Sequence, residues 1–323
     1  TFNFAGGTLR ARGQGRTIGN FMEGLTDARV KSGGAVVDTR DNTVTLNQSL
    51  LDGGGKGGLT KLGSGALLLG GTNTYVGMTI VSNGVLVALA PSAVPGYRTP
   101  GRVNVCDGAG LAVGLGGSGA WTPEDILALA SSASFGSQSF FGLDTTCGSA
   151  AIGENLNLGA ADLVKVGAKA LRLTGKNVYS GGTVVSDGIL QADFGAGLPR
   201  STHVALKGGT LSSANGCLTC ALGEGAGQVS ASAGQRGGFS AWGLPLRVNL
   251  GGAAGTLKWG SASFCPDALI LNGAAADQPL VFANGLDLAG GARTVVVSAS
   301  AEGAAATLAG NISDSVGGGS LIK

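Results

Sequence analysis

The sequence predicts an all-β fold, a right-handed parallel β-helix in which short strands stack coil upon coil. Three observations favour it: an internal repeat, short segments of alternating hydrophobicity, and a high density of turn residues. Glycine accounts for 62 of 323 residues, yet 43% of the chain is hydrophobic and only 12% is charged. A chain this apolar has to bury a core. Because aromatic residues make up only 5%, we expect Val, Leu, Ile and Ala to fill that core in narrow stacked layers.

The repeat occurs at 58–87 and again at 162–191, and the two copies align without a gap at a shift of 104 residues (163 − 59). The matched positions are Lys61/Lys165, Gly63/Gly167, Leu67/Leu171, Leu69/Leu173, Asn73/Asn177, Tyr75/Tyr179, Gly77/Gly181, Thr79/Thr183, Gly84/Gly188 and Leu86/Leu190. A third copy begins near residue 317, with Lys323 in the place of Lys61 at a shift of 262 (323 − 61). Self-similarity of this kind indicates a repeat architecture.

The strands are read from alternating apolar residues bounded by turn signals such as Asn83-Gly84 and Asp187-Gly188. The expected strands lie at 34–38, 42–46, 66–69, 79–81, 85–87, 202–206, 246–250 and 294–298. A β-sandwich would need longer strands and a more aromatic core. The β-helix therefore fits better, with Gly and Asn at corners that need a positive φ.

One stretch departs from the coil pattern, a loop and short-helix excursion around 91–150. Thr122 is an N-cap candidate, Pro123 stands at the first helical position, and Glu124 and Asp125 follow in the first turn. This order predicts a helix start. We expect residues 1–323 to form a single elongated β-helical segment that is a fragment of a longer chain.

The repeat motif, GLTKxGxGxLxLxGxNxYxGxTxVxxGxL, resembles the autotransporter-associated β-strand repeat, also called the passenger-associated tandem repeat. The second copy departs from it at Lys169, where the motif has Gly, and at Val178. The resemblance implies a β-helical stalk segment of a large exported bacterial protein, displayed at the cell surface and adhesive or matrix-like. It carries no catalytic residues. It also implies an outer-membrane translocator, which this segment lacks.

Catalytic chemistry has few candidates. His203 is the chain's one histidine and stands in an expected strand without a second His or a Cys partner. Asp38, Arg40 and Asp41 are the nearest approach to the grouped carboxylates that a β-helical carbohydrate-active enzyme would use. The same run can equally be a solvated edge with local ion pairs. We expect no catalytic, cofactor-binding or metal-binding residues.

The repeated polar residues favour structural interpretations. Lys61, Lys165 and Lys323 stand at equivalent points, where a lysine blunts a strand edge or caps the stack more often than it binds a ligand. The Asn73/Tyr75 and Asn177/Tyr179 positions could form ladders, with Asn side chains bonding along the stack. An exposed aromatic–Asn ladder that binds glycans is the alternative.

The five cysteines are read as disulfide candidates, because export implies an oxidising compartment. Cys217–Cys220 would staple a local loop and Cys106–Cys147 would clasp the 91–150 excursion. Other pairings stay open, and Cys265 is left over for a bond between chains or as a buried thiol. One CxxC without a second pair is weak support for zinc.

The sequence thus favours a non-enzymatic structural or adhesive protein, extracellular or on a bacterial cell surface. Its expected partners are further copies of the chain, stacked end to end or into filaments, and host or matrix glycans. The net charge of +2 gives no reason to expect nucleic acid. The alternative is a β-helical carbohydrate-active enzyme or glycan-binding module.

Overall fold

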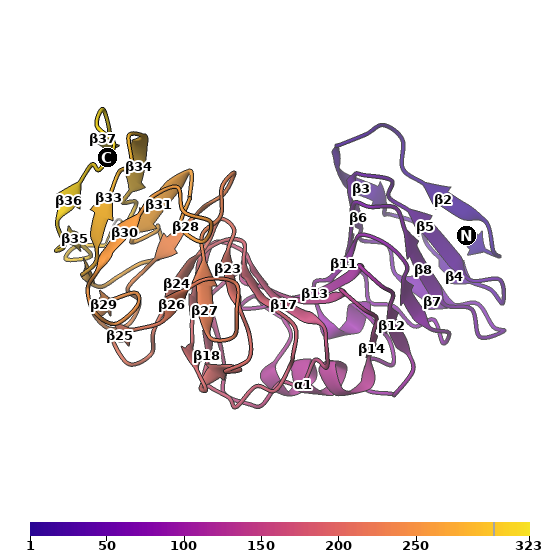
Figure 1. Ribbon diagram of the computed structural model, residues 1–323. Helices are drawn as coiled ribbons and strands as arrows, with labels where there is room; N and C mark the ends of the chain where they lie inside the picture. Colours follow the sequence, from indigo (N-terminus) through magenta and orange to yellow (C-terminus); the bar gives the residue numbers. More distant parts are fainter. Residues whose placement is uncertain (300) are drawn as a thin grey trace. The chain divides into compact units, whose positions relative to one another are not determined.

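The computed structural model describes residues 1–299 and 301–323 and divides into two compact units (Figure 1). Unit 1 comprises Thr1–Asp144 and Leu156–Leu163, and unit 2 comprises Thr145–Asn155 and Val164–Lys323. Each unit is built from short β-strands in several sheets. The single elongated segment expected from the sequence stays a prediction.

Unit 1 holds three series of strands, each in the order in which its members are hydrogen-bonded. The first is β1 (Phe2–Phe4), β4 (Ala28–Val30) and β7 (Leu50–Asp52). The second is β2 (Thr8–Arg10), β5 (Ala35–Asp38), β8 (Leu59–Leu62), β10 (Thr79–Val81), β12 (Val103–Val105) and β14 (Ser134–Phe135). The third is β3 (Thr17–Met22), β6 (Thr43–Leu46), β9 (Ala66–Leu69), β11 (Val85–Ala88), β13 (Gly110–Gly114) and β15 (Phe140–Asp144).

Unit 2 repeats this organisation. One series is β17 (Asp162–Val166), of which Val164–Val166 belong to unit 2, then β19 (Thr183–Val185), β23 (Val204–Leu206), β27 (Gln228–Ser230) and β26 (Ala221–Leu222). An eight-stranded sheet contains β16 (Ala150–Ile152), β18 (Ala170–Leu173), β20 (Ile189–Gln191), β24 (Thr210–Ser212), β28 (Arg236–Phe239), β31 (Ala268–Leu271), β34 (Ala292–Val296) and β37 (Ser320–Ile322). A four-stranded sheet contains β25 (Cys217–Leu218), β29 (Leu246–Val248), β32 (Leu280–Phe282) and β35 (Ala306–Leu308). A three-stranded sheet contains β30 (Thr256–Lys258), β33 (Gly285–Asp287) and β36 (Ile312–Ser313). A two-stranded sheet contains β21 (Asp193–Phe194) and β22 (Gly197–Leu198).

Neighbouring strands in these sheets run parallel, and most strands inside a sheet pair with the strand one coil earlier and the strand one coil later. Val44 in β6 lies opposite Leu67 in β9. Leu67 in turn lies opposite Leu86 in β11. Residues paired between successive coils lie from 19 (Leu67 and Leu86) to 34 (Val248 and Phe282) residues apart, and a chain that returns to the same sheet at such intervals with parallel pairing forms a parallel β-helix. This fold prediction is confirmed.

The interior consists of columns of aliphatic side chains that stack from coil to coil. In unit 1 one column contains Val44, Leu67, Leu86 and Leu111, all fully buried. Burying one such side chain contributes about 1.5–3 kcal/mol. Leu, Val and Ala fill most of the core, as the composition indicates.

The corner after β10 and its equivalent after β19 require glycine. Gly84 and Gly188 have φ values of 64° and 63°. A Cβ atom added to Gly84 would lie 2.3 Å from the backbone oxygen of Gly65, and one added to Gly188 would lie 2.4 Å from that of Lys169. Both the positive φ and the close approach of the next coil exclude a larger residue.

The expected helix is confirmed as α1 (Pro123–Ser132). Thr122 accepts a hydrogen bond from the Asp125 amide, and the Asp125 carboxylate accepts one from the Thr122 amide, which forms a capping box. The same 91–150 range also contains the 3-10 helix η1 (Pro91–Ala93) and strands β12 to β15. The departure from the coil is therefore narrower than that range.

Candidate functional site

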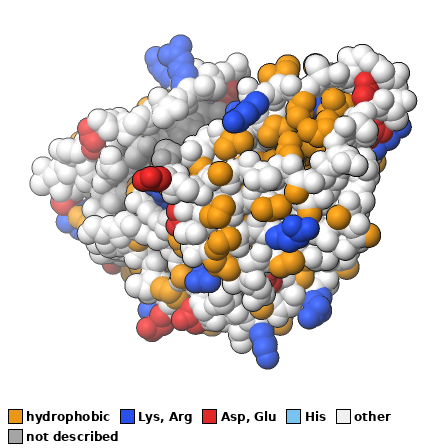
Figure 2. Space-filling view, turned by 90° about the vertical axis from the view of Figure 1, so that its left-hand side faces the viewer, with side chains coloured by type: hydrophobic (Ala, Val, Ile, Leu, Met, Phe, Trp, Pro, Cys, Tyr) orange, Lys and Arg blue, Asp and Glu red, His pale blue; other side chains and the backbone are white. Residues whose placement is uncertain are grey.

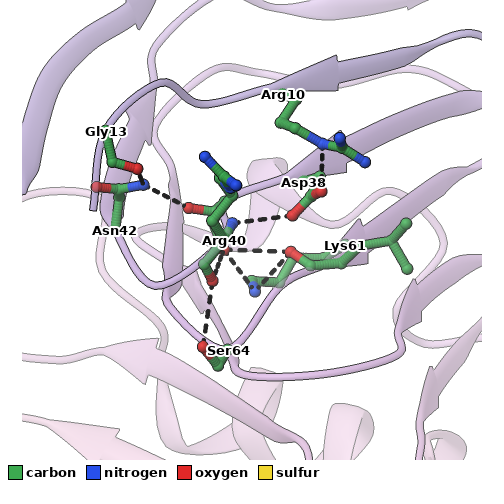
Figure 3. A network of polar contacts seen from close by, with 9 residues as sticks. Arg10, Gly13, Asp38, Arg40, Asn42, Lys61 and Ser64 are labelled. Atoms are coloured by element: carbon green, nitrogen blue, oxygen red, sulfur yellow. Dashed lines mark hydrogen bonds and ion pairs between the residues drawn. The ribbon is translucent and has the colours of Figure 1, made fainter. Parts of the chain in front are cut away.

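Polar groups in an unusual environment, around a buried lysine, lie at the corner that follows β8 in unit 1. Lys61 in β8 points inward, between Val37 and Val81 of the neighbouring strands, and its side chain is fully buried. Its ammonium lies within hydrogen-bond distance of four oxygens, the backbone oxygens of Leu62 at 3.1 Å, Gly63 at 2.6 Å and Asn83 at 2.9 Å, and Thr39 Oγ1 at 3.0 Å, to which it can donate its three protons. Figure 3 shows Lys61 among the polar groups of this corner.

The second repeat copy builds the same corner in unit 2. Lys165 in β17 is fully buried, and its ammonium donates to the backbone oxygens of Val166 at 3.0 Å, Gly167 at 2.6 Å and Asp187 at 2.9 Å. Each lysine therefore bonds two carbonyls of its own coil and one carbonyl of the next coil. The three carbonyls of Lys61 are equivalent to the three of Lys165. Their shared function is to supply a donor to corner carbonyls, among them those of Asn83 and Asp187 in the next coil.

We expected these lysines to blunt a strand edge or to cap the stack. The structure places them in the interior of the coil instead. Lys61 and Lys165 lie inside the coil, because they have the same parity along their strands as the buried Leu59 and Leu163. That parity is visible in the sequence. Lys323, in the place of the third copy, is exposed.

Burial lowers the pKa of Lys61 to about 8, and the Asp38 carboxylate nearby opposes this in part. The ammonium is costly to bury, and four oxygen acceptors offset that cost. A fully buried amine cannot reach a substrate. The corner is therefore a structural element rather than a nucleophilic or Schiff-base site.

The Asp38, Arg40 and Asp41 run lies on the outer side of the same corner. Asp38 accepts hydrogen bonds from Arg10 Nε at 2.7 Å and from the Arg40 amide at 2.9 Å (Figure 3). Arg40 and Asp41 are exposed. Burial acts to raise the pKa of Asp38, but the hydrogen bonds from the Arg40 amide and Arg10 outweigh it and hold that pKa below its ordinary value.

A carboxyl group with a lowered pKa is a poor proton donor, whereas glycoside hydrolysis needs one acid with a raised pKa opposite a second carboxylate. The neighbouring contacts are structural as well. Ser64 donates to the backbone oxygen of Arg40, and Asn42 donates to that of Gly13 (Figure 3). The run is an ion-paired edge, the alternative left open by the sequence.

The Asn and Tyr positions of the repeat bond neighbouring coils through the backbone. Asn73 accepts from the Leu50 amide at 2.8 Å, one coil earlier, and donates to the Ala93 oxygen at 2.7 Å, one coil later. Asn177 donates to the Gly197 oxygen at 2.7 Å in the same way. These side chains bond along the stack, but to backbone groups rather than to each other.

Both tyrosines are buried, so they do not form the exposed aromatic ladder that the sequence left open. Tyr75 and Tyr179 are 1% exposed. Their hydroxyls share hydrogen bonds with Thr79 at 2.6 Å and Thr183 at 2.8 Å. The glycan-binding ladder considered from the sequence is therefore not present.

His203 is a satisfied structural residue. Its Nε2 lies 2.8 Å from Ser230 Oγ, and the side chain is half-buried. Burial lowers its pKa, which favours the neutral imidazole. Ser230 is buried as well, at 2% exposure, so the pair does not face a substrate.

All five cysteines are free, so neither predicted disulfide is present. The Cys217–Cys220 pair is wrong for a geometric reason. Along an extended segment, residues three apart point to opposite sides. Cys217 is exposed and Cys220 is buried, and burial raises the pKa of Cys220 to about 12. Cys106 and Cys265 are half-buried and Cys147 is exposed, each as a free thiol.

Within residues 1–299 and 301–323, no three or more His, Cys, Asp or Glu side chains are grouped to hold a metal ion. No helix in that part of the chain combines the length and apolarity needed to cross a membrane. On the face shown in Figure 2, charged side chains are scattered singly, while hydrophobic ones gather in a larger group.

Comparison with known families identifies the repeat that builds these corners. The family model of the passenger-associated transport repeat matches residues 59–88 and 163–192. The chain carries two passenger-associated transport repeats. Their matched residues include both buried lysines, both Asn residues and both Tyr residues described above. The third copy expected near residue 317 lies outside the matched ranges and stays a prediction.

A curated relative extends the likeness beyond the repeats. The chain is 30% identical over 243 residues to the adhesin BmaC autotransporter of Brucella suis biovar 1 (strain 1330). The alignment covers 64% of this chain and 7% of that relative, so the chain spans a small part of the protein it matches. No solved structure matches the chain.

Sequence reasoning missed the partners of the lysines. Thr39 Oγ1 accepts from the Lys61 ammonium, and Thr145 Oγ1 lies within hydrogen-bond distance of the oxygens of Val166, Gly167 and Lys169 at the second corner, nearest to that of Lys169 at 2.9 Å. Both threonines lie one coil before their lysine and outside the aligned copies. The repeat alignment therefore gave no signal for them.

Proposed function

We propose that this chain is a non-enzymatic adhesive passenger segment, part of a protein exported to a bacterial surface. One observation carries the proposal: the chain contains two passenger-associated transport repeats, and 64% of the chain aligns with a small part of an autotransporter adhesin. The β-helix supports it, because a stack of coils presents a long surface without needing a catalytic centre.

The geometry of the repeat supports a structural use of its polar residues. The ammonium groups of Lys61 and Lys165 bond corner carbonyls, and Asn73 bonds the coils on either side. Asp38, the best acid candidate, is held ionised by Arg10.

The finer parts of the proposal concern the whole protein. We infer that a translocator lies elsewhere in the longer chain, that the β-helical segment serves as a stalk, and that its partners are matrix or host glycans or further copies of itself in a filament. Electron microscopy of native material distinguishes a filament from isolated molecules.

Surface display is tested on intact bacteria with antibodies raised against residues 1–323. We expect labelling of intact cells that disappears after external protease treatment. Labelling only after the cells are permeabilised would contradict export to the surface.

Adhesion is tested with beads that carry the folded chain of residues 1–323, set against beads that carry the same chain unfolded in urea and left unable to refold. We expect the folded chain to retain beads on host cells or on matrix-coated plates. Equal retention of the two bead types, or none, would contradict a folded adhesive surface.

A further inference from the structure

The chain contains four Asn-Gly dipeptides: Asn83-Gly84, Asn215-Gly216, Asn272-Gly273 and Asn284-Gly285. In such a pair the backbone nitrogen of Gly can attack the carboxamide carbon of Asn, because glycine has no side chain to hinder the approach. Whether the reaction occurs in a folded protein depends on how the two groups are held. The structure holds the four pairs differently.

Two of the four carboxamides are locked in the interior of unit 2. Asn272 is fully buried; its Oδ1 accepts from the Ala241 amide at 2.8 Å and its Nδ2 donates to the oxygens of Gln278 and Ala304. Asn284 is 1% exposed; its Oδ1 accepts from the Leu250 amide at 2.7 Å. Neither carboxamide can turn toward its own Gly without breaking these bonds.

The third pair is tethered at the surface. Asn215 is exposed, and its Nδ2 donates to the Asp193 carboxylate at 3.0 Å. A negative charge beside the carboxamide also disfavours the anionic nitrogen that the attack requires. Asn215 is therefore exposed but restrained.

Asn83 is the exception. It is exposed at the corner after β10, and its Oδ1 lies 2.7 Å from the Gly84 amide nitrogen. The carboxamide carbon is bonded to that oxygen, so it sits beside the nitrogen that would attack it. Within the described residues the Asn83 Nδ2 has no hydrogen-bond partner, which leaves the departing group free toward solvent.

The buried lysine adds an activating charge. The Lys61 ammonium donates to the backbone oxygen of Asn83 at 2.9 Å. That oxygen belongs to the same peptide group as the Gly84 nitrogen. A positive charge on it stabilises the peptide anion that forms when the nitrogen loses its proton, and this stabilisation is larger away from bulk water.

We propose that Asn83 is a site of spontaneous deamidation, at which Lys61 activates the Gly84 amide for attack on the Asn83 carboxamide. The bond from Gly84 N to Asn83 Cγ forms, the bond from Cγ to Nδ2 breaks, and the amide proton passes through solvent to Nδ2, which leaves as ammonia. The resulting five-membered imide then takes up one water molecule at either carbonyl and opens to aspartate or isoaspartate.

The second repeat copy shows that the aspartate product fits this corner. Asp187 occupies the equivalent place, and its Oδ1 lies 2.7 Å from the Gly188 amide nitrogen. Lys165 donates to the Asp187 backbone oxygen at 2.9 Å, the same distance as in copy one. Deamidation to aspartate would give the two corners the same residue before the glycine, with the same contacts to the glycine amide and the lysine. Isoaspartate would instead lengthen the backbone of the corner by one carbon.

The experiment uses the full chain, incubated folded at neutral pH, below the Lys61 pKa of about 8 so that the ammonium keeps its charge, then digested and analysed by peptide mass spectrometry at all four dipeptides in the same samples. We expect conversion at Asn83 to exceed that at Asn272 and Asn284 by at least about tenfold, since those two react only when the structure opens. A parallel incubation in urea should bring the four rates close together. Equal rates in the folded chain, or a slower rate at Asn83 than at Asn215, would overturn the proposal.

Two variants test the activating lysine. Asp187→Asn places an Asn-Gly pair beside Lys165, and we expect it to convert at a rate close to that of Asn83. Lys61→Met should lower the rate at Asn83 relative to Asn215 measured in the same molecule. No conversion at the substituted corner of Asp187→Asn, or an unchanged ratio in Lys61→Met, would overturn the activating effect. If Lys61→Met does not fold, the Asp187→Asn result decides, because it leaves every buried lysine in place.

Discussion

Lys61 occupies a place that its neighbours in the stack fill with valine. Val37 lies opposite it one coil earlier and Val81 one coil later, and all three side chains are fully buried. The aliphatic stem of lysine continues this column, while the ammonium reaches the corner and bonds backbone oxygens there. One side chain thus serves as core and as hydrogen-bond donor.

Replacing Lys61 by Met tests the donor function, because Met keeps the stem and removes the ammonium. The variant leaves the backbone oxygens of Gly63 and Asn83 without this donor. We expect the free energy of unfolding to fall by about 2–4 kcal/mol, measured by urea denaturation. The control is Lys176→Met at an exposed lysine, which should change it by less than about 0.5 kcal/mol. Equal effects at both positions would contradict the corner function.

The same lysine predicts a dependence of stability on pH. In the folded chain the pKa of Lys61 is lowered to about 8 from an ordinary value of 10.5. Between these values the unfolded chain binds more protons than the folded one, so raising the pH favours folding, by up to about 3 kcal/mol across the window. Asp38, the charged group facing Lys61, is ionised throughout this range.

We therefore expect the stability difference between the native chain and Lys61→Met to grow as pH rises from 8 to 10.5. Taking the difference cancels the contribution of Tyr75, whose pKa is raised by burial in both proteins. The measurement is urea denaturation of both proteins at several pH values in the window. A difference that stays constant or shrinks would contradict the lowered pKa.

Some residues of the candidate site could be predicted from the sequence and others could not, for physical reasons. The repeat alignment located Lys61 and Asn73 because identity at a fixed shift marks positions that the fold constrains. It could not show that Thr39 contributes its hydroxyl to the same corner, since that contact comes from the coil before the repeat. The Cys217–Cys220 disulfide was predicted from the compartment alone, and strand geometry places those two side chains apart.

At the scale of elements, the short strands were predictable because each coil has to alternate inward and outward residues. The strands at 66–69 and 79–81 have the predicted bounds. The limits of the excursion were not predictable, because Gly110–Gly114 is a strand that begins and ends with glycine. Its hydrogen bonds to β11 and β15 hold this segment as a strand, although its own sequence does not indicate one.

Asn73 joins three successive coils and therefore predicts a strong effect for a small substitution. Asn73→Ala removes the acceptor of the Leu50 amide and the donor to the Ala93 oxygen, both buried. We expect a loss of about 2–3 kcal/mol in the free energy of unfolding, measured by urea denaturation. Asn47→Ala, at an exposed asparagine in the same unit, is the control and should have little effect. Loss of similar size at Asn47 would contradict the bridging function of Asn73.

At the scale of the whole molecule, stability rests on the stacking of coils rather than on covalent links. All five cysteines are free, so no disulfide bonds one part of the chain to another within the described residues. In each unit the hydrophobic columns and the bonds between neighbouring coils supply the cohesion instead. Stability of this kind is close to a sum of coil terms and nearest-neighbour terms.

The parallel pairing of each strand with the coil before it has a consequence for how such a chain reaches its native state. Leu67 meets Leu86 of the next coil, and Leu190 meets Leu211 in the same way. Because the paired residues are close in sequence, the entropy cost of closing each loop stays small. A polypeptide delivered gradually, from either end, can therefore add one finished layer at a time without waiting for distant residues to arrive.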